Sequence, residues 1–185
     1  MKKITAVLCL LAALSVNGQA RKAGIYLTYD DYLHNKLSYE TDNCKGIILN
    51  EFFDAPFISI KNNNQKIQLK KDSIYGITTC NNQLLRFYNN EAYTLTEKGA
   101  IWIFTKSINE HQNKSIVSNK QYFFSTNGND KLKKLTISNL KKSFINNIKL
   151  HDLLDVEFKH DDQLTAYDNA HHLYKVDELI EAAIK

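Results

Sequence analysis

The sequence predicts an α+β fold, in which an antiparallel β-meander (a curved sheet or partial barrel) precedes a C-terminal segment of two to three helices. Residues 45–106 contain short apolar segments roughly every 8–12 residues, separated by Asn- and Gly-containing turns. Residues 131–185 instead carry apolar side chains at helical spacing. Strands first and helices last, with no Pro- or Ser-rich linker, favour one domain with the helices packed on one face or end of the sheet.

The first 20 residues have the features of a secretory signal peptide and are excluded from the fold. Lys2 and Lys3 precede an apolar run over 4–16, and the small residues Gly18 and Ala20 suit a cleavage site after position 20. No later run is long and apolar enough to span a membrane. We therefore expect export to the periplasm or the cell exterior, as a soluble protein.

The remaining segment, 21–185, has about 165 residues, which suits a single domain. A chain of this size buries roughly 70% of its unfolded surface, so it needs neither a metal nor many disulfides to fold. We expect 21–127 to be mainly β and 131–185 to be mainly α. Within the first part, Thr28 can cap a short helix over roughly 29–35.

The charge balance argues against a nucleic-acid partner. The formal net charge is +4, and about +2 remains once the two signal-peptide lysines are removed. Of the 24 basic residues only Arg21 and Arg86 are arginine. Bidentate recognition of phosphates or guanine edges by guanidinium groups is therefore nearly unavailable.

Asparagine-rich turns define the expected strands. "PFISIK" and "QKIQLKK" flank the asparagine triplet 62–64, which predicts a hairpin because Asn tolerates the left-handed conformation. The asparagine pairs 81–82 and 89–90 predict turns before "QLLRFY" and "EAYTLT". Residues 107–120 are polar and aperiodic, so they are predicted to form a long exposed loop.

The helical segment is expected to begin at Thr136 or Ser138, either of which can cap a helix. That helix would carry Leu140, Phe144 and Ile148 at four-residue spacing.

Another apolar stripe follows from Leu150 to Phe158. Asp161 or Asp162 can cap a further helix that runs through the tyrosines and histidines of 167–174, and a helical pattern continues to the C-terminus.

Cys44 and Cys80 are the two cysteines beyond the signal peptide. In an oxidising compartment such a pair can form a disulfide, worth on the order of 4 kcal/mol in the chain-entropy model. Two separate buried thiols are the alternative. There is no CxxC motif and no cluster of Cys with His, so a zinc finger or thioredoxin-type site is not supported.

Three segments carry a family resemblance. They are "GIYLTYDDYLHNKLSYE", "SIYGITTCNNQLLRFYNNEAYTL" and "LTISNLKKSF…LHDLLDVEFKHDDQLTAYDNAHHLYKV". With these segments in this order, the chain resembles an uncharacterised group of small secreted proteins from Bacteroidota, over nearly the whole length after the signal peptide. The resemblance implies export in a Gram-negative cell and brings no catalytic motif.

The stretch "YDNAHHLYKV" holds the strongest local candidates for a binding site: Tyr167, Asp168, His171, His172 and Tyr174. On a helix, Asp168 can reach either histidine, at spacings of three and four residues. Adjacent histidines diverge by about 100° on a helix, so they do not face one ion together. We therefore expect neither a metal ion nor a catalytic residue here, and interpret the stretch as a helix docked on the sheet.

The motifs of several enzyme classes are missing from the sequence. It contains no GxSxG, GxGxxG or GxxxxGK motif, and no cofactor is expected. Ten tyrosines and nine phenylalanines are many for this length, and several fall in the strand region: Tyr75, Phe87, Tyr88, Tyr93, Trp102 and Phe104. These rings either form the core of the sheet or line a groove for a sugar, peptide or lipid.

The leading hypothesis is an exported, non-enzymatic binding module that takes an envelope protein or a small ligand. The alternative is a periplasmic or secreted hydrolase-type enzyme. Its site would be assembled from His and Asp residues of the C-terminal segment: His151, Asp155, His160, Asp168 and His171.

Overall fold

A computed structural model describes the chain from Ala23 onward, apart from four short internal segments. The described ranges are 23–41, 46–49, 55–62, 65–112 and 115–185. The predicted signal peptide lies outside them. In this part of the chain, no helix is long and apolar enough to cross a membrane.

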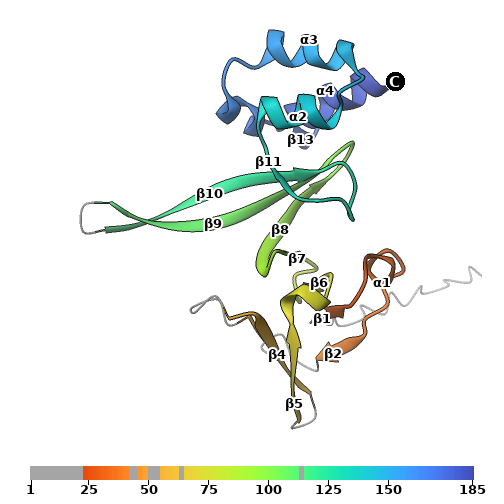
Figure 1. Cartoon of the computed structure of the whole chain (residues 1–185), viewed down its shortest axis with the longest axis vertical. Coiled ribbons are helices and arrows are strands. Elements are labelled where there is room, and N and C mark those ends of the chain that lie inside the picture. The colour runs from red at the N-terminus through yellow and green to blue at the C-terminus, as the bar shows by residue number, and fades with distance from the viewer. Residues whose placement is uncertain (1–22, 42–45, 50–54, 63–64, 113–114) are drawn as a thin grey trace, which may run out of the picture.

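An antiparallel sheet organises the described residues (Figure 1). Its eight strands lie in the order β11-β10-β9-β8-β7-β6-β1-β2, so β6 to β11 form a meander and β1 inserts beside β6. The order is open, with β11 and β2 at its edges. The α+β prediction, with an antiparallel meander followed by helices, is confirmed. The strands are β1 (Ala23–Tyr26), β2 (Tyr39–Thr41), β6 (Gly76–Thr78), β7 (Leu84–Tyr88), β8 (Glu91–Lys98), β9 (Trp102–Gln112), β10 (Ser115–Ser125) and β11 (Lys133–Lys134).

A smaller sheet is formed by the chain between β2 and β6. It contains β3 (Ile47–Ile48), β4 (Phe57–Asn62) and β5 (Gln65–Lys70), all antiparallel. The predicted hairpin around the asparagine triplet is therefore confirmed, with Asn62 opposite Gln65. A short helix, α1 (Tyr29–Leu33), follows β1 where Thr28 was expected to cap it, and a 3-10 turn, η2 (Lys71–Ser73), leads into β6.

Asparagine residues form turns of the meander, as the sequence predicts. Asn89 and Asn90 form the two-residue connection from β7 to β8, and both have positive φ, 51° and 63°. Two successive left-handed residues suit the right-handed twist of a hairpin, and Asn tolerates that conformation best after Gly. Asn82, with φ 59°, serves the turn before β7 in the same way.

The prediction of an exposed loop over 107–120 is wrong. Residues 107–112 belong to β9 and residues 115–120 to β10, and the two strands pair from Trp102–Ser125 out to Gln112–Ser115. Figure 1 shows this hairpin extending beyond the rest of the sheet. The sequence there is mostly polar and lacks the alternation of apolar and polar residues that marks a half-buried strand, so the backbone pairing was not predicted.

The two faces of the large sheet are covered differently. Residues opposite one another in neighbouring strands share a face. Ile77 pairs with Leu85, and Ile103 with Phe124; this face is covered by the small sheet at one end and by the helices at the other. The opposite face carries most of the large aromatic side chains and is covered by α1 and the segment around Gly128.

Three helices follow the meander: α2 (Ile137–Ser143), α3 (Ile148–Glu157) and α4 (Lys175–Ile184). They pack together against β9 and β10, as Figure 1 shows at the top of the molecule. Thr136 caps α2, one of the two residues predicted for this role. The buried side chains that join helices to sheet are Ile101, Ile103, Phe124, Leu135, Leu140, Leu150, Leu154, Phe158, Leu164, Val176 and Ile180.

One helix prediction is wrong in its boundaries, and another is wrong in the kind of structure it expected. Leu140 and Ile148 do not share one helix, because Asn147 accepts a hydrogen bond from the Leu150 N–H and starts α3 anew, leaving Ile148 exposed. The predicted helix through 167–174 is replaced by a 3-10 turn, η3 (Asp161–Thr165), and a small hairpin. That hairpin pairs β12 (Tyr167–Asp168) with β13 (Leu173–Tyr174).

Candidate functional site

Asp168 is the residue that turns the predicted helix into a hairpin. Its Oδ1 accepts hydrogen bonds from the backbone N–H groups of Ala170 and His171, at 2.7 and 3.2 Å. Such side-chain to backbone bonds compete with helix formation. His172 completes the turn with a positive φ of 56°. The argument that adjacent histidines diverge on a helix therefore does not apply to this stretch.

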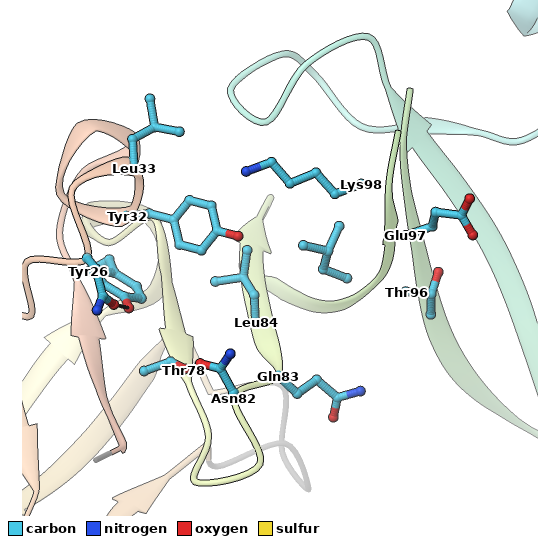
Figure 2. Close-up of a pocket in the computed structure, with 12 residues that line it drawn as sticks. Tyr26, Tyr32, Leu33, Thr78, Asn82, Gln83, Leu84, Thr96, Glu97 and Lys98 are labelled. Carbon is cyan, nitrogen blue, oxygen red and sulfur yellow. Dashed lines mark hydrogen bonds between the residues drawn. The ribbon is translucent and has the colours of Figure 1, made fainter. Parts of the chain in front are cut away.

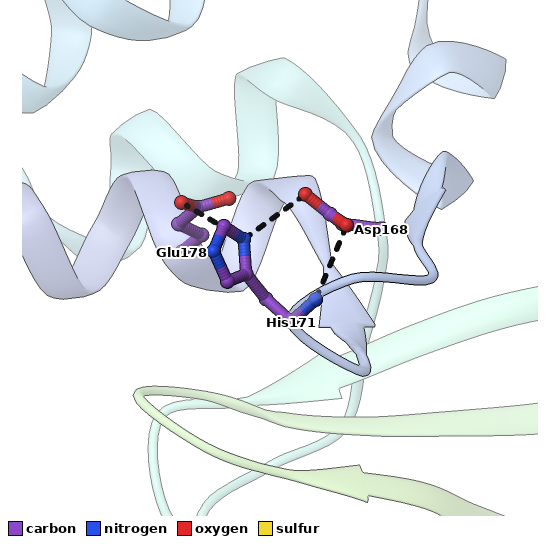
Figure 3. A group of neighbouring side chains, drawn as sticks. All are labelled: Asp168, His171 and Glu178. Carbon is purple, nitrogen blue, oxygen red and sulfur yellow. Dashed lines mark hydrogen bonds and ion pairs between the residues drawn. The ribbon is translucent and has the colours of Figure 1, made fainter.

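The hairpin brings Asp168 and His171 together but leaves His172 out of the group. His171 Nδ1 lies 3.1 Å from Asp168 Oδ2 and 3.7 Å from Glu178 Oε1 on the first turn of α4 (Figure 3). Each of the three offers one ligand atom, and these atoms all lie within 4.8 Å of one another. The pKa of Asp168 is lowered, first by the two backbone N–H donors and then by His171.

Tyr167 and Tyr174 pack together rather than forming part of this group. They lie opposite each other across the hairpin, with ring centroids 5.3 Å apart in an edge-to-face arrangement. Tyr174 also contacts Tyr122 of β10, with centroids 6.1 Å apart, and so joins the hairpin to the sheet. Burial is the main cause of the raised pKa of Tyr174.

The other C-terminal residues considered for an enzyme site have local structural partners. His151 Nε2 lies 3.1 Å and 3.0 Å from the carbonyl oxygens of Lys141 and Phe144, at the end of α2. Asp155 pairs with Lys141, and His160 is the N-cap residue that precedes η3. The structure thus brings together Asp168 and His171, with Glu178 as a partner that the sequence analysis did not single out.

A second candidate lies on the aromatic face and centres on α1. Thr28 and Asp31 form a reciprocal capping box that starts this helix: the Asp31 N–H donates to Thr28 Oγ1 and the Thr28 N–H to Asp31 Oδ2. The helix directs Tyr29 and Tyr32 at the sheet. Their rings contact Tyr75 and Trp102 at centroid distances between 5.4 and 6.0 Å. We call Tyr26, Tyr29, Tyr32, Tyr75 and Trp102 the aromatic cluster.

The aromatic cluster borders a cleft of about 460 Å³, which Figure 2 shows between α1 and β8. One side is apolar and aromatic, and the other offers amide, hydroxyl and charged groups. Tyr26 Oη donates to Asn35 Oδ1 at 2.8 Å, which fixes one corner. The cleft is lined by Tyr26, Tyr32, Leu33, Asn35, Thr78, Asn82, Gln83, Leu84, Leu95, Thr96, Glu97 and Lys98.

The two charged residues at the end of β8 point in different directions in Figure 2. Lys98 lies opposite Trp102 in the sheet, and its Nζ is 4.7 Å from the Trp102 ring centroid and 5.7 Å from that of Tyr32. Glu97 turns toward the helical side, where its Oε1 accepts from the Tyr174 N–H at 3.3 Å. Lys98 therefore presents its charge on the cleft side, above aromatic faces.

Arg86 lies behind the aromatic cluster and has a structural role. It is only 4% exposed, and its Nη2 donates to the carbonyl oxygens of Asn129 and Asp130 at 3.2 and 2.7 Å. Its guanidinium carbon lies 5.5 Å from the centre of the Tyr75 ring and 5.7 Å from that of Phe104. The rings thus surround the nitrogens that lack a hydrogen-bond partner among the described residues, and burial lowers the pKa of the group.

Sequence reasoning identified Tyr75 and Trp102 but missed the tyrosines that cover them. Tyr29 and Tyr32 are three residues apart on the predicted helix, and this spacing is the signal that marks a common face, while Tyr26 lies in the strand before it. The partners of that face lie far away in the sequence, so its position over Trp102 required the fold.

Cys80 is disulfide-bonded. Its predicted partner Cys44 lies outside the described residues, so the pairing stays a prediction.

Comparison with known proteins identifies no relative: the chain matches no family model, no curated protein and no solved structure.

Proposed function

We propose that this chain is an exported, non-enzymatic binding module that takes a small neutral ligand, a saccharide, in the cleft beside α1. The observation that carries the proposal is the composition of the cleft, in which tyrosine rings face neutral hydrogen-bonding side chains. A sugar offers an apolar ring face for aromatic contact and hydroxyl groups for amides. Export rests on the signal-peptide features of the first 20 residues and on the resemblance to secreted proteins of Bacteroidota.

The polar groups around the cleft suit hydroxyl recognition. Asn35, Asn82 and Gln83 each supply an amide, which can donate and accept, and Thr78 and Thr96 supply hydroxyls. Burial raises the pKa of Tyr26 and Tyr32, so their phenols stay neutral hydrogen-bonding groups. Lys98 adds three donors beside the rings.

The size of the cleft is also suitable. Small-molecule sites usually enclose about 300–1,000 Å³, and this cleft has about 460 Å³. The aromatic cluster that borders it is firmly packed, because Tyr26, Tyr75 and Trp102 are almost fully buried. A preformed aromatic surface of this kind binds a ring without the entropic cost of ordering a loop.

The test is a screen of neutral oligosaccharides (cello-, malto- and chito-oligosaccharides) by saturation-transfer NMR, followed by calorimetric titration of those that bind. Replacing Tyr32 by Ala should weaken binding by roughly tenfold or more, because a central aromatic contact is lost. Gln83→Ala should weaken it less and leaves folding intact, since Gln83 is exposed.

Tyr167→Ala is the matched control, because it removes a partly exposed tyrosine from the hairpin on the other side of the sheet. It should bind the same sugars as the wild type. Failure of every oligosaccharide to bind, or equal losses in Tyr32→Ala and Tyr167→Ala, would reject the proposal.

A hydrolase-type enzyme is the second candidate, and the contact between Asp168 and His171 is the observation that favours it. A carboxylate beside an imidazole can orient a general base. The pair lies with the helices, whereas the cleft lies on the opposite face of the sheet. Hydrolysis of one of the oligosaccharides, abolished by His171→Ala, would support the enzyme over the binding module.

A further inference from the structure

We propose that Asp168, His171 and Glu178 bind one divalent transition-metal cation, with Zn²⁺ as the best match. The proposal is independent of the saccharide cleft, which lies on the other face of the sheet. It rests on three different ligand side chains whose ligand atoms already converge. They come from two elements, the β12–β13 hairpin and the first turn of α4.

The separations fit a tetrahedral ion. Zinc lies about 2.0–2.2 Å from nitrogen and oxygen ligands, so two ligands of a tetrahedral site are roughly 3.3–3.5 Å apart. His171 Nδ1 is 3.1 Å from Asp168 Oδ2 and 3.7 Å from Glu178 Oε1. These two values lie on either side of the required spacing, and the Asp168 and Glu178 oxygens lie within 4.8 Å of each other. The Glu178 side chain is 49% exposed, so it is free to rotate toward the other two ligands.

Asp168 is already oriented for this role. Backbone N–H groups occupy its Oδ1, which leaves Oδ2 directed at His171. A metal bound there would receive one oxygen from Asp168, one from Glu178 and one nitrogen from His171. Three protein ligands leave a fourth position for water, the arrangement of an open zinc site.

The proton balance of binding is simple. In the metal-free state His171 Nδ1 lies within hydrogen-bond distance of Asp168 Oδ2, at 3.1 Å. On binding, Nδ1 gives its lone pair to the ion, and the ring adopts the tautomer with the proton on Nε2. The His171 side chain is 61% exposed, so water is available to accept from Nε2–H. No proton has to be stored or buried.

The ligand set also selects among cations. Imidazole nitrogen favours zinc, copper and nickel, whereas magnesium and calcium favour sites made of oxygen alone. Two carboxylates supply two negative charges that offset the charge of a divalent ion. The bound ion would link the hairpin to the first turn of α4, where Figure 3 shows the three side chains beside one another.

The test is calorimetric titration of ZnCl₂ into the purified chain, freed of any polyhistidine tag and treated with chelator. Cobalt(II) binding is followed in parallel by visible absorption, which reports tetrahedral coordination. We expect one ion per chain in the wild type. His171→Ala and Glu178→Gln should each weaken binding by roughly 100-fold or more, because two ligands remain.

His172→Asn is the control, because it removes the neighbouring imidazole and Asn tolerates the positive φ at that position. It should bind zinc like the wild type. Circular dichroism of each variant separates loss of ligand from loss of fold. Absence of zinc binding in the wild type, or an equal loss in His172→Asn, would overturn the proposal without affecting the saccharide result.

Discussion

The cleft and the histidine hairpin (167–174) are assembled in opposite ways. The cleft gathers side chains from Tyr26 to Lys98 across α1 and four strands, so it exists only when the sheet is formed. The Asp168–His171–Glu178 group spans eleven positions and depends on one turn and one helix start. Changes to the sheet or its cover should therefore damage the cleft first, and changes within the hairpin should stay local.

Of the variants that test this comparison, Trp102→Ala should cause the largest loss of unfolding free energy. The indole is buried under Tyr29 and Tyr32 and supports the whole aromatic cluster. Truncating a buried Trp costs about 3–5 kcal/mol of unfolding free energy. Urea unfolding followed by far-UV circular dichroism measures the loss, because Trp102 is the only tryptophan fluorophore.

Tyr167→Ala is the corresponding variant in the histidine hairpin, and its loss of unfolding free energy is compared with that of Trp102→Ala. Tyr167 is 46% exposed, so its removal should cost less than about 1 kcal/mol. Similar losses in the two variants would show that the aromatic cluster is not the stability centre that its burial indicates.

Asp177→Ala should have the next largest effect, because Asp177 docks α4 on the sheet. Its Oδ1 accepts from the buried N–H of Ile101 at 2.9 Å. The contact is so close that a Cβ at Gly99 would lie 1.7 Å from Asp177 Oδ2. Leaving the Ile101 N–H unpaired should cost about 1–3 kcal/mol. The urea midpoint measures it, and an unchanged midpoint would contradict the docking role.

The same carboxylate makes a prediction about pH. Burial, and then the charge of Glu181, raises the pKa of Asp177 in the folded chain. The folded state therefore holds this proton more tightly than the unfolded state, whose Asp pKa is about 3.9. Its contribution to stability is full below that value and is lost as the pH rises through the folded pKa.

Asp177→Asn has no such titration and serves as the comparison. The unfolding free energy of Asp177→Asn minus that of the wild type should increase as the pH rises from below about 3.9 through the folded pKa. Urea titrations over this range measure the trend. A constant difference would mean that Asp177 does not titrate differently in the two states.

The sequence predicted the meander because its signals are local. The asparagine triplet marked the β4–β5 hairpin, and asparagine pairs marked turns that Asn89 and Asn90 close with positive φ. The β9–β10 hairpin escaped prediction because residues 107–112 and 115–120 do not alternate between apolar and polar, and backbone pairing alone leaves no such pattern in the sequence. For the candidate sites, Asp168 and His171 were found as residues, but their geometry was wrong because the Asp168 turn outweighed the helical spacing.

Thr28→Ala should lower the unfolding free energy by a smaller amount and should also lower the oligosaccharide affinity of the cleft. The substitution removes the side-chain acceptor of the Asp31 N–H and should cost about 1 kcal/mol. Because α1 has only five residues, its Tyr32 should lose its fixed position, and oligosaccharide affinity should fall.

Thr136→Ala is the matched variant, since Thr136 caps α2 through the Asn139 N–H. It should cost a similar free energy of unfolding and leave oligosaccharide affinity unchanged. Calorimetric titration of both variants compares the two caps. Equal changes in affinity in the two variants would mean that the position of α1 does not determine oligosaccharide binding in the cleft.

The smallest effect is expected at Asp168, where it tests how local the hairpin is. Backbone donors lower the pKa of this carboxyl, so the turn bonds persist above the folded pKa and are lost as the pH falls through it. The NMR amide shift of Ala170 should titrate below the ordinary Asp value of about 3.9. In Asp168→Asn, which accepts the same bonds at every pH, the shift should stay constant, and the urea midpoint should match the wild type. A titration at or above the ordinary value would mean that the Asp168 turn does not hold the hairpin in solution.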